Sequence, residues 1–318
     1  MKIVVLDAAT LGQDISLAPL AELGELTVYD NTSPHELAAR LADCDVVVQN
    51  KVRLDEAAFA AAGHLALVAE LATGYDNIDL AAARRHGVAV CNVPGYSTPS
   101  VVQVTLAMAL SLATHLPAYR AHVASGAYSA GGIANKLTPV YHELAGKTWG
   151  VVGYGAIGRA VGEVARALGC RLLVCRKTET KDTVTLDALC READIISLHT
   201  PLTAATRGLI DRRHLALMKP GVILLNTARG AVTDEAAVAE ALQEGRLGGL
   251  GVDVYSSEPF SPSHPFYAIR DDARVCLTPH MAWGSFEART RCLATVAENI
   301  RAFLEGKKQN RVDLCNNI

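Results

Sequence analysis

A glycine-rich turn between a short apolar strand and a helix constrains the fold of this chain more than any other feature. The strand covers residues 148–152 and an alanine-rich helical run covers 156–168. In such a turn the first glycine allows a tight bend, the second lets a pyrophosphate approach the backbone, and the third lets helix and strand pack closely. The sequence therefore predicts a dinucleotide site at six consecutive residues: Gly153, Tyr154, Gly155, Ala156, Ile157 and Gly158.

Short runs rich in β-branched residues alternate with helical runs along most of the chain, a pattern typical of parallel α/β folds. A turn-rich connector at residues 94–99 interrupts the alternation, and we expect a long apolar helix over 100–124 and an irregular stretch over 125–143. A chain of 318 residues also favours two domains. We therefore expect one domain over about 1–98 and a second over about 99–285.

The overall composition gives little reason to expect a macromolecular or membrane partner. The 30 basic and 33 acidic residues nearly balance, which argues against nucleic acid and anionic membranes as partners. No apolar run approaches the roughly 20 residues of a transmembrane helix. The eight cysteines are scattered without a C-x-x-C pair, so we expect reduced thiols, no metal site and a cytoplasmic protein.

The end of the second strand of the nucleotide unit bears on the choice of cofactor. NAD sites usually place Asp or Glu there to bind the ribose hydroxyls, whereas this chain has Arg176, Lys177 and Thr178. Two cations and no acid suit a 2′-phosphate, which favours NADP over NAD. The alternative is that these are solvated loop residues of an enzyme that uses NAD without the acidic anchor.

Three further stretches, at residues 224–230, 251–259 and 277–283, each place a charged or titratable residue just after an apolar run. Ligands bind at this edge of open parallel sheets. The residues are Arg229, Glu258 and His280, which together suit hydride transfer to a 2-oxo acid. A histidine can deliver a proton near neutral pH, a carboxylate beside it orients the ring, and an arginine can grip a substrate carboxylate at two points. Singly, each could instead be a surface pair, a turn residue or a packed histidine.

These stretches together make the chain resemble the D-isomer-specific 2-hydroxyacid dehydrogenase family over nearly its whole length. The resemblance rests on the glycine turn and on residues 73–79, 197–203, 226–230, 251–259 and 278–283. It implies two Rossmann-like, doubly wound parallel domains and a homodimer. The flavodoxin-like substrate domain would be discontinuous, with residues 1–98 and 286–318, and residues 99–285 would form the dinucleotide-binding domain.

The resemblance also implies roles for individual residues. Arg229 would hold the substrate, His280 would be the acid/base, and Glu258 would pair with it. Backbone amides around Thr73 and Gly74 would bind the substrate carboxylate. Eight further residues would line the cofactor: Thr105, His199, Thr200, Pro201, Thr206, Thr227, Ala228 and Asp253.

Within the family, residues 50–52 and 93–98 resemble glycerate dehydrogenases, which reduce hydroxypyruvate or glyoxylate to D-glycerate or glycolate. Lys51 could help to hold such a small anion, although a solvated lysine is an equal alternative. Residues 128–141 depart from the aromatic-rich form expected in close relatives, in a region that can border the active site or the dimer partner. Two rival functions remain: a 3-phosphoglycerate dehydrogenase, and a nucleotide-sensing scaffold like the corepressor branch. Formate dehydrogenases also resemble this family but lack a glutamate at the position of Glu258, so Glu258 argues against that activity.

Overall fold

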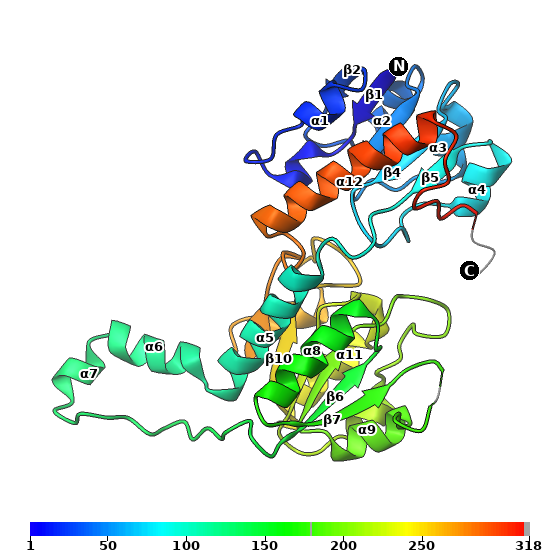
Figure 1. Ribbon diagram of the computed structural model, residues 1–318. Helices are drawn as coiled ribbons and strands as arrows, with labels where there is room; N and C mark the ends of the chain where they lie inside the picture. Colours follow the sequence, from blue (N-terminus) through cyan, green and yellow to red (C-terminus); the bar gives the residue numbers. More distant parts are fainter. Residues whose placement is uncertain (179, 315–318) are drawn as a thin grey trace. The chain divides into compact units, whose positions relative to one another are not determined.

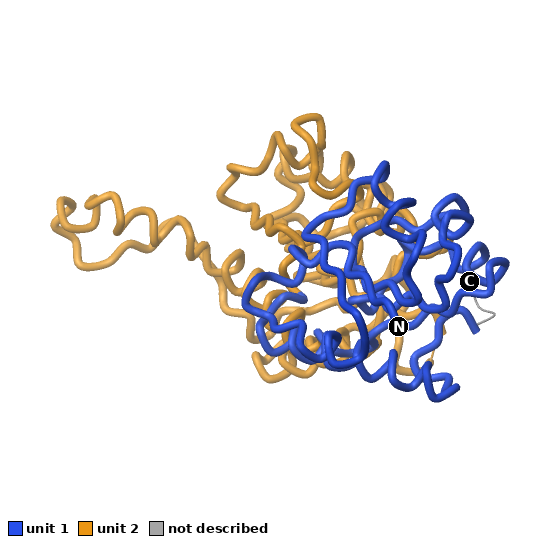
Figure 2. The backbone as a smooth tube through the Cα atoms, turned by 90° about the horizontal axis from the view of Figure 1, so that it is seen from above, with its two compact units in different colours: residues 1–97, 283–318 blue, residues 98–282 orange. Residues whose placement is uncertain are grey.

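The computed structural model describes residues 1–178 and 180–314, and the chain divides into two compact units. Unit 1 comprises Met1–Ser97 and Trp283–Ile318, and unit 2 comprises Thr98–Ala282 (Figure 2). The domain boundaries expected from the sequence fall between residues 98 and 99 and between residues 285 and 286. Cys315, one of the cysteines expected to be reduced, lies outside the described residues.

Unit 1 is built on a five-stranded parallel sheet in the order β2-β1-β3-β4-β5. Its strands are β1 (Lys2–Val5), β2 (Glu25–Val28), β3 (Val46–Gln49), β4 (Leu67–Glu70) and β5 (Ala89–Cys91). Its helices are α1 (Ala18–Ala21), α2 (Pro34–Leu41), α3 (Glu56–Ala61), α4 (Leu80–Arg85) and α12 (Phe286–Leu304), with the 3-10 turn η1 (Ala8–Leu11).

Alternate residues of strands β1, β3, β4 and β5 face two separate apolar cores. In β3, Val46 and Val48 pack into the core that α12 covers, whereas Val47 packs into the core beneath α3 and α4. Local sequence signals fix where the helices begin. Ser33 and Glu36 form a capping box at α2, and Asp55 and Asp79 cap α3 and α4. The C-terminal helix therefore packs on the sheet formed by the N-terminal residues.

Unit 2 is built on a six-stranded parallel sheet in the order β11-β10-β9-β8-β6-β7. Its strands are β6 (Thr148–Val152), β7 (Arg171–Cys175), β8 (Ile195–Leu198), β9 (Val222–Asn226), β10 (Leu247–Val252) and β11 (Val275–Leu277). Its helices on the sheet are α5 (Thr98–Ala113), α8 (Ala156–Ala167), α9 (Leu186–Glu192), α10 (Arg212–Leu217) and α11 (Glu235–Gln243), with 3-10 turns η2 (Gly230–Val232) and η3 (Pro265–Ile269).

The two faces of the unit 2 sheet are covered by different helices. Trp149 and Val151 pack with residues of α5 and α8, while Val152 and Leu198 pack with residues of α9, α10 and α11 (Figure 1). Both units are therefore parallel sheets with helices on both faces. This confirms the predicted α/β class.

All six strands of unit 2 end in a single row across the sheet. The register aligns, from one edge to the other, Cys175, Val152, Leu198, Asn226, Val252 and Leu277. The chain reverses its direction of progress across the sheet at β6, so a crevice is expected between β6 and β8 at this carboxyl edge. The candidate cofactor and catalytic residues that the sequence placed after a strand of unit 2 all lie in loops that begin at this row.

The prediction of one helix over residues 100–124 was wrong. Helix α5 ends at Ala113 and a second helix, α6 (Leu116–Ala124), begins at Leu116, bent by 67° from the first. Pro117 explains the break, because its ring would clash with the carbonyl of Ala113 in a continuous helix. His115 adopts a left-handed conformation at the bend. Among the described residues no single helix could cross a membrane, and only the bent pair α5 and α6 satisfies length and composition together.

The stretch at 125–143, expected to be irregular, contains one short helix, α7 (Ala127–Ala130). With α6 it forms an arm, defined here as residues 114–143, that leaves the end of α5 and returns to β6 (Figure 1). No residue of α6 or α7 is buried. The arm therefore makes no contribution to either core of unit 2.

Candidate active site

The glycine turn after β6 shows which of its glycines the chain itself requires. Gly153 has φ +90°, and an added Cβ would lie 2.5 Å from the carbonyl oxygen of His199. At Gly158 an added Cβ would lie 2.1 Å from the carbonyl oxygen of Gly153. At Gly155 it would meet no protein atom within 4 Å. The fold therefore requires the first and third glycines, and only a molecule outside the chain would require the second.

This arrangement fits the phosphates of a dinucleotide. Gly155 is the N-cap of α8, a helix of 12 residues, so the free N–H groups of the first turn lie next to the open space at Gly155. A helix N-terminus with free N–H groups favours negative charge. Gly155 and Ala156 are exposed and Tyr154 and Ile157 are half-buried, so the turn is accessible from solvent. The residues present therefore suit a pyrophosphate.

The loop after β8 is folded by its own polar groups. The Thr206 hydroxyl donates to the carbonyl of Pro201 at 2.6 Å and accepts from the backbone N–H of Thr203 at 2.8 Å. Burial lowers the pKa of His199 to about 3, so its imidazole is neutral, and its buried Nε2 has no hydrogen-bond partner among the described residues. Thr200 is half-buried. This loop lies beside the glycine turn, because His199 contacts Gly153.

The three residues that suggested a 2′-phosphate site directly follow β7. Arg176, Lys177 and Thr178 are all exposed. The carbonyl of Cys175, just before them, accepts a hydrogen bond from the Gly153 N–H at 2.8 Å. The end of β7 is therefore bonded to the glycine turn. Strand β7 flanks β6 on one edge and β8 flanks it on the other.

His280 and Glu258 form a hydrogen-bonded pair in unit 2. The His280 Nδ1 lies 2.6 Å from the Glu258 Oε2, and the two side chains are 21% and 28% exposed. The other carboxylate oxygen accepts from the backbone N–H of Tyr255 at 2.9 Å. Nδ1 is therefore the ring nitrogen that faces the carboxylate.

The turn that carries His280 is held by Asp253, which follows β10. The Asp253 carboxylate accepts from the Thr278 hydroxyl at 2.6 Å and from the backbone N–H groups of Met281 and Ala282 at 2.8 Å and 2.9 Å. Burial raises the pKa of this carboxyl above its ordinary range. His280 itself has φ +52°, a left-handed conformation that few residues other than glycine adopt. The sequence predicted Asp253 as a cofactor residue; its hydrogen bonds hold the turn of the catalytic candidate.

Arg229 follows β9 and is positioned by Asn226. The Asn226 side chain accepts from the Ala228 N–H at 3.0 Å and donates to the Arg229 carbonyl at 2.9 Å, which closes the turn. Thr227, on the same turn, has its hydroxyl 2.9 Å from the hydroxyl of buried Thr105 on α5. Arg229 is half-buried. The turns bearing Arg229, Glu258 and His280 thus leave three neighbouring strands, β9, β10 and β11, beyond one row.

Sequence reasoning missed several residues that hold this site together, among them Asn226, Tyr255 and Glu235. Glu235 accepts from the Ser256 N–H at 2.9 Å, close to Glu258 in the chain. Asn226 is the last residue of a strand otherwise made of apolar residues, which is a signal that could have identified it. Tyr255 and Glu235 carry no comparable signal, because their roles depend on contacts between distant segments.

The candidate substrate residues of unit 1 lie after β3 and β4. Lys51 and Thr73 are exposed and Gly74 is half-buried. The buried carboxylate of Asp7 accepts from the backbone N–H of Lys51 at 2.6 Å. The Thr73 hydroxyl donates to the carbonyl of Val93 at 2.7 Å. Both candidate loops are thus anchored to other strand ends of unit 1.

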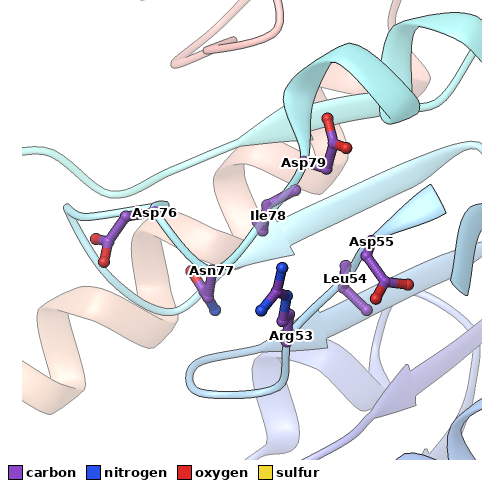
Figure 3. Close-up of a pocket in the computed structure, with 7 residues that line it drawn as sticks. All are labelled: Arg53, Leu54, Asp55, Asp76, Asn77, Ile78 and Asp79. Carbon is purple, nitrogen blue, oxygen red and sulfur yellow. The ribbon is translucent and has the colours of Figure 1, made fainter. Parts of the chain in front are cut away.

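A hollow adjoins these loops in unit 1 (Figure 3), lined by Arg53, Leu54, Asp55, Asp76, Asn77, Ile78 and Asp79. The Asn77 amide donates to the carbonyls of Asn50 and Val52 at 3.2 Å and 3.1 Å, which ties the two loops together. Three carboxylates against one guanidinium make this hollow a poor receptor for a small anion. We therefore do not assign the substrate to it.

Comparison with known proteins adds to this geometry. Residues 106–282, more than half of the chain, match the family model of the D-isomer specific 2-hydroxyacid dehydrogenase NAD binding domain. A hydroxypyruvate reductase of Blautia hydrogenotrophica is 35% identical, covering 98% of this chain and 100% of its own. The solved D-lactate dehydrogenase of Aquifex aeolicus, complexed with NAD and lactic acid, has a TM-score of 0.87 at 27% identity and covers 99% and 100% of the two chains. An acyclic imino acid reductase in complex with NADPH and D-Arg has a TM-score of 0.84 at 27% identity and covers 98% and 100%.

A parallel sheet with a glycine turn between a strand and a helix at its carboxyl edge is typical of dinucleotide-binding domains. The chain belongs to the D-isomer specific 2-hydroxyacid dehydrogenase family, as the resemblance predicted. It is accordingly an oxidoreductase of the kind that acts on CH–OH groups, with an NAD-binding domain in unit 2.

Proposed function

We propose that this protein reduces a small 2-oxo acid, hydroxypyruvate or glyoxylate, to D-glycerate or glycolate with a reduced nicotinamide dinucleotide. The observation that carries the proposal is the 2.6 Å contact between His280 and Glu258, which follow β11 and β10, the two strands on one side of the strand β9 that precedes Arg229. The name of the Blautia hydrogenotrophica relative, hydroxypyruvate reductase, supports this substrate class. We place the activity in the cytoplasm, on the scattered cysteine spacing of the sequence.

Each residue of the set has a distinct task in this reaction. Arg229 would bind the substrate carboxylate in bidentate fashion and fix the oxo group. His280 would donate its Nε2 proton to the carbonyl oxygen as that oxygen becomes a hydroxyl. Glu258 would hold the ring and stabilise its protonated form. The bound dinucleotide supplies the hydride that the carbonyl carbon receives. Lys51, Thr73 and Gly74 remain predicted substrate residues.

A substrate panel tests this function and its rivals. We expect purified protein to oxidise NADPH or NADH with hydroxypyruvate and glyoxylate at least tenfold faster, in kcat/KM, than with pyruvate or phosphohydroxypyruvate, followed at 340 nm. Preference for phosphohydroxypyruvate would instead support a 3-phosphoglycerate dehydrogenase. Dinucleotide binding with no turnover on any of the four acids would support the nucleotide-sensing scaffold.

We propose NADP as the preferred cofactor, because exposed Arg176 and Lys177 follow β7 where an acid would bind the ribose of NAD. We expect kcat/KM to be higher with NADPH than with NADH. Arg176→Ala should lower this ratio about tenfold, since a charge-assisted hydrogen bond contributes about 1.5–3 kcal/mol. Arg166→Ala, an exposed arginine in the last turn of α8, is the matched control. A ratio below one in the wild type would contradict the proposal.

We further propose that the arm pairs with a second copy of this chain. Its apolar side chains are strongly exposed, with Leu137 at 72%, Ile133 at 68% and Val140 at 66%. Several large apolar side chains exposed on one segment are typical of a surface that binds another protein. We expect a dimer by light scattering, and a monomer for Ile133→Asp combined with Leu137→Asp. Leu304→Asp, at a residue 57% exposed in unit 1, should leave the dimer intact. A monomeric wild type would refute this assignment.

A further inference from the structure

We propose that Glu235, bonded to His264, is a positioning residue for the reaction: it holds the Tyr255–Ser256 peptide, and Tyr255 in turn holds Glu258 against His280. The inference rests on the proposed function, because it takes Glu258 and His280 as the acting pair. Both Glu235 and His264 lie outside the set that the sequence predicted, and neither follows a strand directly.

The hydrogen bonds of Glu235 use both of its carboxylate oxygens. Oε1 accepts from the Ser256 N–H at 2.9 Å, and Oε2 accepts from the Ser256 hydroxyl and lies 3.0 Å from the His264 Nε2. The His264 Nδ1 accepts from the Phe266 N–H at 3.2 Å, so the ring hydrogen is on Nε2 and is donated to Glu235. Glu235 and His264 are 7% and 9% exposed. A carboxylate so deeply buried is retained only when its oxygens are bonded in this way.

The helix that carries Glu235 does not need it. Asp234 already caps α11, because its side chain accepts from the Ala237 N–H at 3.1 Å. Most of the buried residues of α11 are Ala, Val and Leu, and they pack into the apolar core of unit 2. Glu235 is the one buried residue of this helix whose hydrogen bonds run to the loop after β10. Its burial therefore serves that loop.

The Tyr255–Ser256 peptide is packed tightly on a second side as well. An added Cβ at Gly230 would lie 2.0 Å from the Tyr255 carbonyl carbon and 2.2 Å from the Ser256 nitrogen. Gly230 directly follows Arg229, so the turn that bears Arg229 is in contact with this peptide. Glu235 holds one side of the peptide through its hydrogen bonds with Ser256. The backbone of Gly230 packs against the other side, so the peptide cannot move towards the Arg229 turn.

Tyr255, whose carbonyl begins this peptide, bonds to Glu258 and to the turn that carries His280. The Tyr255 N–H donates to the Glu258 Oε1 at 2.9 Å, and the other oxygen of Glu258 contacts His280. The Tyr255 hydroxyl donates to the carbonyl of Thr278 at 2.9 Å, on the turn that carries His280. Glu258 is itself an exposed loop residue and is not fixed by burial. A shift of this peptide would therefore move Glu258 relative to His280.

A double-mutant cycle tests the inference in the full-length protein. Glu258→Gln should lower kcat by on the order of 100-fold, the range of general acid–base effects. Glu235→Ala should lower kcat at least tenfold with the KM for the cofactor within twofold, because the glycine turn is untouched. In the Glu258→Gln background Glu235→Ala should cost less than about threefold more, since its effect acts through Glu258. Glu240→Ala, on the same helix in an exposed ion pair with Arg212, is the matched control.

Two milder variants keep the test decisive if Glu235→Ala folds poorly. Ser256→Ala removes the hydroxyl that donates to Glu235, and His264→Gln removes the ring that pairs with Glu235; each should lower kcat several-fold and couple to Glu258→Gln in the same way. Wild-type kcat in all three variants, or losses that simply multiply with that of Glu258→Gln, would overturn the inference alone. An unchanged kcat in Glu258→Gln would overturn the inference and the role of Glu258, whereas the proposed function would fail only if the wild-type protein showed no turnover.

Discussion

Replacing His280 by asparagine should lower kcat by about 10³-fold while the protein still binds its dinucleotide. General acid–base catalysis by a positioned side chain contributes roughly 10²–10⁴-fold to rates, and asparagine cannot exchange a proton at neutral pH. Asparagine is a better choice than alanine because His280 has φ +52°, a region that asparagine tolerates. The hydrogen bonds of the Asp253 carboxylate run to the Thr278 hydroxyl and to the backbone N–H groups of residues 281 and 282. They do not involve the His280 side chain and are therefore retained in the variant.

Steady-state kinetics with hydroxypyruvate and a titration of cofactor fluorescence measure the two halves of this prediction. His64→Asn, at an exposed histidine of unit 1, is the control for a generic loss of an imidazole. A kcat within tenfold of wild type in the His280 variant would remove His280 from the chemistry. A loss of cofactor binding together with rate would show instead that the substitution disturbs the dinucleotide domain.

The carboxyl edge of unit 2 could be predicted from the sequence because its signals are local. A run of apolar residues predicts a buried strand, parallel strands share one carboxyl edge, and the residue after each run therefore lies at that edge. The six strands do end in one row, and this places the segments from Gly153, Arg176, His199, Thr227 and Asp253 beside one another. The apolar pattern of the strands and the rules of parallel sheets were together sufficient to predict which segments meet at this edge.

Features that depend on contacts between distant segments were not predictable. Asp253 directly follows a strand, as expected of a cofactor residue, yet its carboxylate bonds to the turn of residues 278–282. Glu235 sits in the first turn of a helix, where an acid is ordinarily explained by the helix dipole. Its bonds to Ser256 and His264 appear only when α11, the loop after β10 and η3 are brought together.

The break between α5 and α6 was missed for a different reason. The run over residues 100–124 is apolar, which favours a single helix, but Pro117 within it breaks the helix by steric clash. The arm carries several large apolar residues that are exposed in this chain, among them Ile133, Leu137 and Val140. Hydrophobicity predicts burial, but it does not specify whether the burying partner belongs to the same chain.

The glycine turn supports a prediction in which binding weakens while stability is unchanged. Gly155→Asp should raise the dissociation constant for the dinucleotide at least about 100-fold, equivalent to about 2.7 kcal/mol, without lowering Tm. An added Cβ at Gly155 meets no protein atom within 4 Å, and the backbone there, at φ −77°, accepts any L-residue. Aspartate is also a preferred N-cap and its charge suits a helix N-terminus. The same carboxylate would repel a pyrophosphate at this turn.

Gly155→Asn separates charge from size, because asparagine is an equally good N-cap of nearly the same shape without the charge. It should weaken binding less than aspartate does and leave Tm equally unchanged, as measured by fluorescence titration and thermal unfolding without cofactor. Gly158→Ala is the opposite case: its Cβ would lie 2.1 Å from the Gly153 carbonyl oxygen, so we expect a lower Tm even in the absence of cofactor. Unimpaired binding in Gly155→Asp would mean that the phosphates lie elsewhere, because the chain gives no reason of its own for a glycine at this position.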